Sequence, residues 1–133
     1  IQETNKLTNK QKLLTSISQF LDHKDNFDID DTSNYTLYKL ATKVNIKVFL
    51  LYIDAYYAGG LKEKVKELRD KAKKLHILTE KLPVLLHGKD IITLGLSPSK
   101  KFSEILLAGY EAQMREEFTT KKGAIQWLKN YTQ

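Results

Sequence analysis

Apolar residues recur every three or four positions through most of the chain, and this spacing is typical of amphipathic α-helices. Thr8 is a suitable N-cap for a first helix. The acidic stretch 22–31 interrupts the pattern and predicts a loop around Phe27 and Ile29. The apolar face predicted for the first helix consists of Leu13, Leu14, Ile17, Phe20 and Leu21.

Two further helices are predicted between Ser33 and the glycine pair Gly59-Gly60. Ser33 caps the first of them, and Asn45 starts the second, over 46–58. Residues 46–58 are apolar nearly all round, which predicts a buried central helix. A strand over 48–50 is the alternative, but the apolar run is too long for one strand. Glycine tolerates the left-handed turn that ends a helix, so the glycine pair ends this one.

A basic helix is predicted next, over 61–78. Its narrow apolar stripe is Leu61, Val65, Leu68, Ala72 and Leu75. Its other faces carry seven Lys or Arg and three acidic residues, a balance of +4. Acid–base pairs one turn apart neutralise part of that charge. We expect a solvated face, which is also suited to border an RNA backbone.

Pro83 breaks the helical pattern, and Gly88 allows a turn into a short helix over 89–94 that Gly95 ends. Ser97 and Pro98 then predict the start of a long helix, as N-cap and first helical residue. This helix is expected to end near Phe118, and Thr119 or Thr120 caps a last helix. The predicted inward positions are Phe102, Ile105, Leu106, Tyr110 and Met114 in the long helix, and Ala124, Ile125, Trp127 and Leu128 in the last.

These elements predict an all-α fold, a compact domain of about six to seven helices. We divide it into a body-like region, 1–82, which holds the central buried helix, and a tail-like region, 83–133, packed with the first as one domain. The hydrophobic fraction of 41% is sufficient for a core. The chain has no cysteine, which excludes disulfides and fits a reducing cytoplasm. Apolar runs are too short to cross a membrane, and a start at Ile1 indicates a piece of a longer protein.

The net charge of the chain is +6, and it is unevenly distributed between the two halves. Residues 1–60 carry seven Lys and seven acids, whereas residues 61–133 carry fifteen Lys or Arg and nine acids. A basic half favours a polyanionic partner such as nucleic acid. Solubility alone explains such a balance equally well.

Groups suited to catalysis are few. The histidines His23, His76 and His87 are far apart in sequence and form no metal-binding pattern. The acids between Asp25 and Asp31 lack the glycine and the closing glutamate of a calcium loop. No phosphate-binding loop or nucleophile elbow is present. We therefore expect no catalytic residue, no metal site and no cofactor in this piece of the protein.

The predicted start of the long helix suggests an anion site. Lys100 and Lys101 lie in its first turn, where cations oppose the positive end of the helix dipole. The backbone N–H groups of Ser99, Lys100 and Lys101, with the two ammonium groups, would form a cradle for a nucleic-acid phosphate. The alternative is that two exposed lysines have no ligand.

Four short motifs occur together here: Gly88-Lys89-Asp90-Ile91, Leu94-Gly95-Leu96-Ser97-Pro98, Glu104-Ile105-Leu106 and Tyr110-Glu111-Ala112-Gln113. With Ala124–Leu128, they resemble the C-terminal region of bacterial class II tRNA nucleotidyltransferases, the family of CCA-adding enzymes and poly(A) polymerases. The resemblance covers about residues 83–130, and the earlier helices fit the family's helical body only in character. Ser99 and Ser103 stand where the family has glycine, and Lys121-Lys122 where relatives are often acidic.

The resemblance implies a region that grips the tRNA backbone and places its 3′ end for nucleotide addition. Catalysis, with Mg²⁺ and CTP or ATP, would belong to an N-terminal head that this chain lacks. The partner is then tRNA, which is recognised through phosphates and 2′-hydroxyls. The expected contacts are Lys89, Ser97, Ser99, Lys100 and Lys101, with Arg69, Lys73, Lys121 and Lys122 as outer contacts.

Two other classes remain open. Gly95 to Pro98 between two helices also matches a helix-hairpin-helix-like DNA-binding module. A helical protein-interaction domain, whose charge only aids solubility, is the third possibility. Aromatic residues do not alternate with basic ones as in a platform for single strands, so most Tyr and Phe side chains, and Trp127, are predicted to lie in the core.

Overall fold

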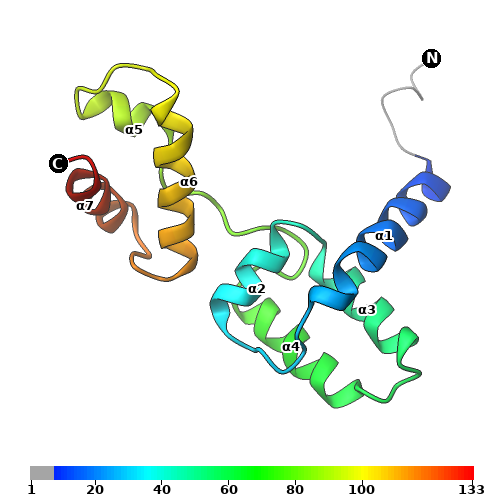
Figure 1. Ribbon diagram of the computed structural model, residues 1–133. Helices are drawn as coiled ribbons and strands as arrows, with labels where there is room; N and C mark the ends of the chain where they lie inside the picture. Colours follow the sequence, from blue (N-terminus) through cyan, green and yellow to red (C-terminus); the bar gives the residue numbers. More distant parts are fainter. Residues whose placement is uncertain (1–7) are drawn as a thin grey trace. The chain divides into compact units, whose positions relative to one another are not determined.

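The computed structural model describes residues 8–133, so Ile1 lies outside the described part. Within that part it contains seven α-helices, one short 3₁₀ helix and no strand (Figure 1). The predicted all-α class is confirmed. The chain divides into two compact units, unit 1 up to Leu82 and unit 2 from Pro83. Their packing as one domain stays a prediction. No helix in 8–133 is long and apolar enough to cross a bilayer.

Unit 1 contains four helices, α1 (Asn9–His23), α2 (Asn34–Ala41), α3 (Ile46–Tyr56) and α4 (Lys62–Lys74), with a 3₁₀ turn at Lys24–Asn26. The predicted caps are confirmed. Thr8 Oγ1 accepts the N–H of Gln11 at 3.1 Å, and Gln11 Oε1 accepts the N–H of Thr8 at 2.8 Å. Ser33 and Asn45 accept N–H groups at the starts of α2 and α3. These bonds satisfy donors that a helix start leaves without partners.

The core of unit 1 forms where α3 packs against α1 and α4. Phe20 of α1 meets Phe49 of α3, with ring centroids 5.8 Å apart. Phe27, in the loop before α2, meets the same ring edge-on at 5.2 Å. Fully buried aliphatic side chains complete this core: Leu37, Ile46, Leu50, Val65, Leu68 and Ile77.

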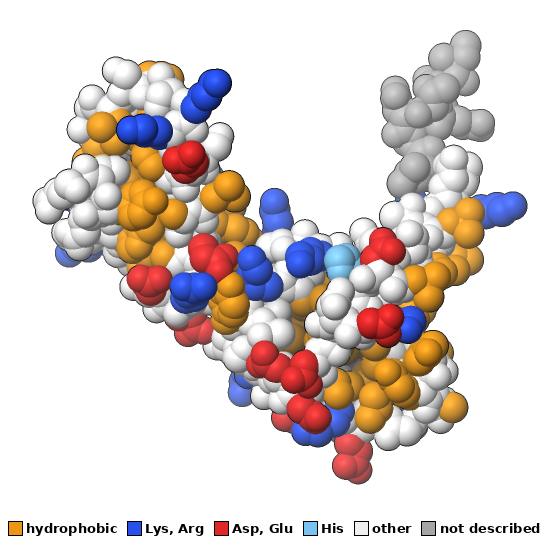
Figure 2. Space-filling model, viewed as in Figure 1, with side chains coloured by type: hydrophobic (Ala, Val, Ile, Leu, Met, Phe, Trp, Pro, Cys, Tyr) orange, Lys and Arg blue, Asp and Glu red, His pale blue; other side chains and the backbone are white. Residues whose placement is uncertain are grey.

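Apolar faces in unit 1 are more exposed than the sequence predicts. Phe20 is the buried member of the predicted α1 face, and Leu13, Leu14, Ile17 and Leu21 are exposed. The predicted central helix, α3, packs on both α1 and α4 and buries Ile46, Phe49, Leu50 and Ile53, but its burial is one-sided, since Leu51 and Tyr56 are exposed. Figure 2 shows apolar side chains over α1 and α3. Helical spacing identifies an apolar face, but other elements decide whether that face is covered.

Two helix ends in unit 1 differ from the prediction. α1 continues through Asp22 to His23, where a loop was expected. α4 ends at Lys74 rather than at Leu78, because His76 adopts a left-handed φ of 61°. The chain reverses there, and the N–H of Ile77 donates to the carbonyl of Ala72 at 3.0 Å. Ile77 then enters the core with no exposed surface.

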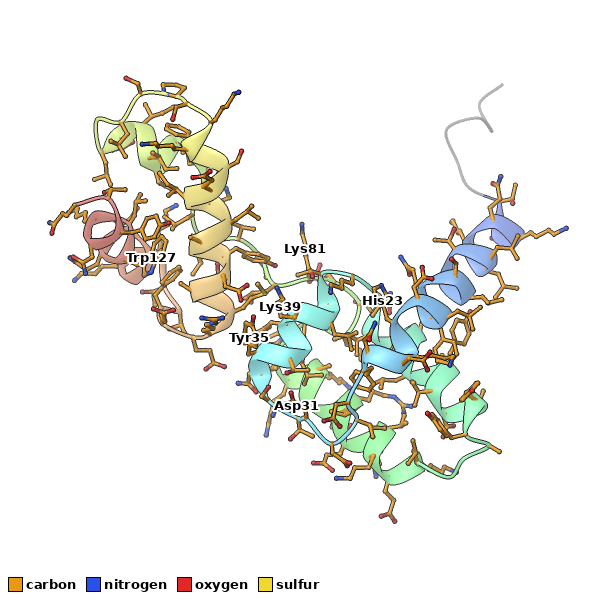
Figure 3. The ribbon with its side chains drawn as sticks, in the orientation of Figure 1. His23, Asp31, Tyr35, Lys39, Lys81 and Trp127 are labelled. Carbon is orange, nitrogen blue, oxygen red and sulfur yellow. The ribbon has the colours of Figure 1, made fainter. Side chains whose placement is uncertain are left out.

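Unit 2 contains α5 (Gly88–Thr93), α6 (Lys101–Met114) and α7 (Lys121–Tyr131), and α6 contacts both of the others. Gly109 permits a close approach at the centre of α6. A Cβ atom there would lie 2.8 Å from Leu86 Cδ1 and 3.3 Å from Trp127 Cζ3. In Figure 3, Trp127 lies between α7 and α6. The buried core is Leu86, Ile91, Ile105, Ala112, Phe118, Ala124 and Leu128.

The predicted bounds of the long helix are wrong at both ends. It starts at Lys101, not after Ser97, because Gly95 (φ 94°) begins a longer connection over 94–100. It ends at Met114, because Glu116 is left-handed (φ 62°), and Phe118 enters the core from the following loop. Thr120 caps α7 by accepting the N–H of Gly123 at 3.1 Å, as predicted.

Candidate nucleic-acid interface

A groove of about 460 Å³ runs along the N-terminal end of α6 in unit 2. The connection 94–100, the first turns of α6 and the end of α7 form its walls. It therefore brings together three of the residues predicted to contact RNA, Ser97, Ser99 and Lys101. The full lining is Leu96, Ser97, Ser99, Lys101, Phe102, Glu104, Ile105, Tyr131 and Thr132.

Ser99 shapes the start of α6, which corrects the predicted phosphate cradle. The Ser99 hydroxyl accepts the N–H of Lys101 at 3.2 Å, and its carbonyl accepts the N–H of Phe102 at 3.1 Å. Lys101 therefore does not offer its N–H to a ligand, and the N–H groups of Ser99 and Lys100 precede the helix. An anion could still meet the serine hydroxyls and the ammonium groups of the exposed residues Lys100 and Lys101.

An aromatic side chain that sequence reasoning missed lies in the same groove. Tyr131 lines it and is 51% exposed. One face of its ring stacks on Trp127, with centroids 4.8 Å apart and planes 14° apart. The Trp127 ring in turn packs against the Phe118 ring, with centroids 5.9 Å apart. Because residues four apart share a helix face, the spacing of Trp127 and Tyr131 was the available signal.

Lys121, predicted as an outer RNA contact, is held within unit 2. Its ammonium lies 2.5 Å from Asp90 Oδ2 and donates to the carbonyl of Leu85 at 2.7 Å. Asp90 also accepts the N–H of His87 at 2.8 Å, at the start of α5. Burial raises the pKa of the Asp90 carboxyl, but its bonds to Lys121 and His87 outweigh burial, and the net pKa is lowered. Lys121 therefore joins α7 to α5, and its neighbour Lys122 is exposed.

Gln113, the last residue of the Tyr-Glu-x-Gln motif, also makes hydrogen bonds within unit 2. Its side chain is 6% exposed. Its Nε2 donates to the carbonyl of Pro83 at 2.8 Å, and its Oε1 accepts the N–H of Leu85 at 3.1 Å. Two motif residues, Asp90 and Gln113, thus stabilise unit 2, whereas Lys89 is exposed.

The other predicted contacts lie on α4 in unit 1. Lys73 is exposed, and Arg69 is half-buried. Arg69 lines a hollow of about 210 Å³ with Asp54, Lys62 and other charged residues. Asp54 Oδ1 is buried there without a hydrogen-bond partner in the described structure. Both hollows mix the two signs of charge, but the groove of unit 2 adds serine hydroxyls and a tyrosine, which the lining of this hollow lacks.

The acidic stretch forms turns. Asp28 Oδ1 accepts the N–H of Asp30 at 2.9 Å. Asp31 accepts the hydroxyl of Thr36 at 2.7 Å and the N–H of Ser33 at 3.1 Å, and these bonds lower its pKa. Figure 3 shows Asp31 in the turn that leads into α2. Across residues 8–133, no group of three or more His, Asp or Glu side chains is placed to hold a metal ion.

Comparison with known proteins identifies no relative. The chain has no significant match to a protein-family model, to a curated protein or to a solved structure. The resemblance to tRNA nucleotidyltransferases stays a prediction that rests on the motif residues.

Proposed function

We propose that this chain is the tRNA-binding C-terminal region of a tRNA nucleotidyltransferase or poly(A) polymerase. It grips the RNA backbone and positions the 3′ end for a separate catalytic head. One observation carries the proposal: the groove beside α6 gathers Ser97, Ser99 and Lys101, which lie in or beside the motifs that resemble this family.

The chemistry of the groove suits an RNA backbone. Lysine ammonium groups and serine hydroxyls are common donors to phosphate oxygens, and such contacts fix position without reading sequence. Lys89, Lys100 and Lys122 are further exposed cations of unit 2. Lys73 and Arg69 of unit 1 would be outer contacts, while Lys121 acts by positioning α7. Mg²⁺ and CTP or ATP would belong to the head, and we expect the enzyme in the cytoplasm.

Two alternatives receive unequal support. A helix-hairpin-helix-like DNA-binding module would join α5 and α6 by a tight turn, but these helices are separated by the longer connection 94–100. A protein-interaction role is favoured by the exposed face of α1, where Leu13, Leu14 and Leu21 are each more than half exposed. That face belongs to unit 1, so a protein contact there is compatible with RNA binding by unit 2.

Competition binding tests the proposal. The chain is bound to a labelled tRNA transcript and challenged with unlabelled tRNA or with duplex DNA of equal length. We expect tRNA to compete better, and affinity to fall steeply between about 50 and 200 mM salt as counterions are released. Better competition by DNA would favour the DNA-binding module. Weak binding without salt dependence would leave the protein-interaction role.

A further inference from the structure

We propose that the groove at the start of α6 holds one unpaired nucleotide of the RNA, with its base stacked on Tyr131. This inference rests on the proposed function, because the bound RNA supplies the nucleotide. It adds a base-stacking site to an interface so far described through backbone contacts.

The Tyr131 ring is placed as the end of an aromatic stack. The Trp127 ring stacks on one face of the Tyr131 ring, nearly parallel to it and with the two centroids 4.8 Å apart. This contact fixes the plane of the Tyr131 ring. Tyr131 is nevertheless 51% exposed and lines the groove. A base on the open face would continue the stack, and stacking is sequence-tolerant because every base has a flat π-face.

The remaining walls match the other parts of a nucleotide. Leu96, Phe102 and Ile105 supply apolar surface against which a base can lie. The Lys101 ammonium and the hydroxyls of Ser97 and Ser99 are donors for a phosphate.

Glu104 lies one helical turn after Lys101 and sets the orientation. Its carboxylate repels phosphate and accepts hydrogen bonds, so ribose hydroxyls or a base amino group should lie on its side. The phosphate is then expected on the side of Lys101.

The dimensions favour a single nucleotide. A volume of about 460 Å³ falls within the range of small-ligand pockets, roughly 300–1,000 Å³. A base inside a duplex is stacked on both faces and cannot also stack on Tyr131. The nucleotide should therefore come from a loop, a bulge or a single-stranded end.

The test compares a short single-stranded RNA with a blunt RNA duplex of similar charge, using anisotropy of labelled RNA. Tyr131→Ala should weaken single-strand binding by about 5- to 150-fold, the effect of losing one base stack. Duplex binding should change less than about twofold, because backbone contacts remain. Tyr131→Phe should restore the wild-type affinity, and Tyr57→Ala, an exposed tyrosine of unit 1, is the matched control.

Trp127 is the single tryptophan of the chain, so its fluorescence reports on the groove. Single-stranded RNA should quench it in the wild type, and blunt duplex should not. Tyr131→Leu, which keeps apolar bulk without a ring, replaces the alanine variant if circular dichroism shows that the latter is unfolded.

Three results would overturn the inference. An equal loss for single strand and duplex would assign Tyr131 a structural role. If Tyr131→Ala has no effect while tRNA still binds with a steep salt dependence, the stacking site is wrong and the proposed function stands. If no RNA binds at any salt concentration, the proposed function fails and the stacking site fails with it.

Discussion

Units 1 and 2 carry positive charge in different ways. Helix α4 alone has seven basic and three acidic residues, whereas the whole of unit 2 has seven basic and five acidic residues. The denser charge lies on a solvated helix face. In unit 2 a single lysine, Lys101, shares a groove with Glu104, two serines and Tyr131. The comparison teaches that charge density locates a surface suited to a polyanion, while convergence of different groups locates a candidate site.

The units also differ in how their apolar residues are covered. In unit 2 the loop residue Phe118 and the chain before α5 complete the core around α6. In unit 1 no described residue covers the outer face of α1 in this way, and Leu13 and Leu14 are each more than half exposed. Exposed apolar surface of this kind is typical of a contact with another protein element. The proposed RNA site and the exposed apolar surface thus lie in different units.

The largest effect is expected from removing a buried side chain. Such substitutions test whether units 1 and 2 unfold independently. Leu128→Ala in unit 2 and Leu68→Ala in unit 1 remove fully buried side chains, and each should cost about 2–5 kcal/mol of folding free energy. We expect Leu128→Ala to lower the thermal midpoint seen by Trp127 fluorescence more than Leu68→Ala does. Equal shifts would instead show that the two units unfold as one domain, as the sequence predicts.

A charge-matched pair of variants compares the start of α6, beside the groove, with α4. Lys100→Glu with Lys101→Glu and Lys73→Glu with Lys74→Glu change the net charge equally. We expect the first pair to reduce tRNA affinity about tenfold or more, and the second about threefold. Removing one lysine–phosphate interaction should also lower the salt slope by about 1. Indistinguishable affinities and slopes for the two double variants would mean that tRNA follows total charge.

The smallest effect concerns Asp90, whose folded pKa lies below its ordinary value of 3.8. The stability it contributes is therefore fully present above pH 3.8 and is lost as pH falls through the lower, folded value. Asp90→Asn should cost unit 2 about 1 kcal/mol at neutral pH. The free energy of unfolding of the Asp90→Asn variant should also depend less on pH below about 4 than that of the wild type. The measurement is Trp127-detected urea unfolding across this range, with Lys121→Met as the partner variant. A variant as acid-sensitive as the wild type would contradict the assignment.

Local features of the fold could be predicted because their partners lie within a few residues. Thr8, Ser33, Asn45 and Thr120 each cap the helix that follows, and the bonds involved span three positions. The sequence predicts the start of α6 too early, because Ser97 and Pro98 have the composition of a helix start, whereas the helix begins at Lys101. The conformation of the connection 94–100 sets this start, and the Ser99 hydroxyl accepts the N–H of Lys101 there.

Features of the site that depend on distant contacts could not be predicted. Tyr131 reaches the groove because α7 packs on α6, with Trp127 close to Gly109. Lys121 meets Asp90 across 31 positions, so a residue that looks like a free cation in the sequence is ion-paired within unit 2. The sequence identified the basic and hydroxyl members of the groove, but its aromatic member required the packing of the helices.

The amide of Gln113 determines where unit 2 can be cut. It binds Pro83 and Leu85, so the irregular segment before α5 belongs to the same folded body as α6. An excised piece that began at Gly88, at the first helix, would leave both bonds of a buried amide unmade and remove Leu86 from the core. A transplant of the groove into another protein must therefore carry the chain from Pro83 onward.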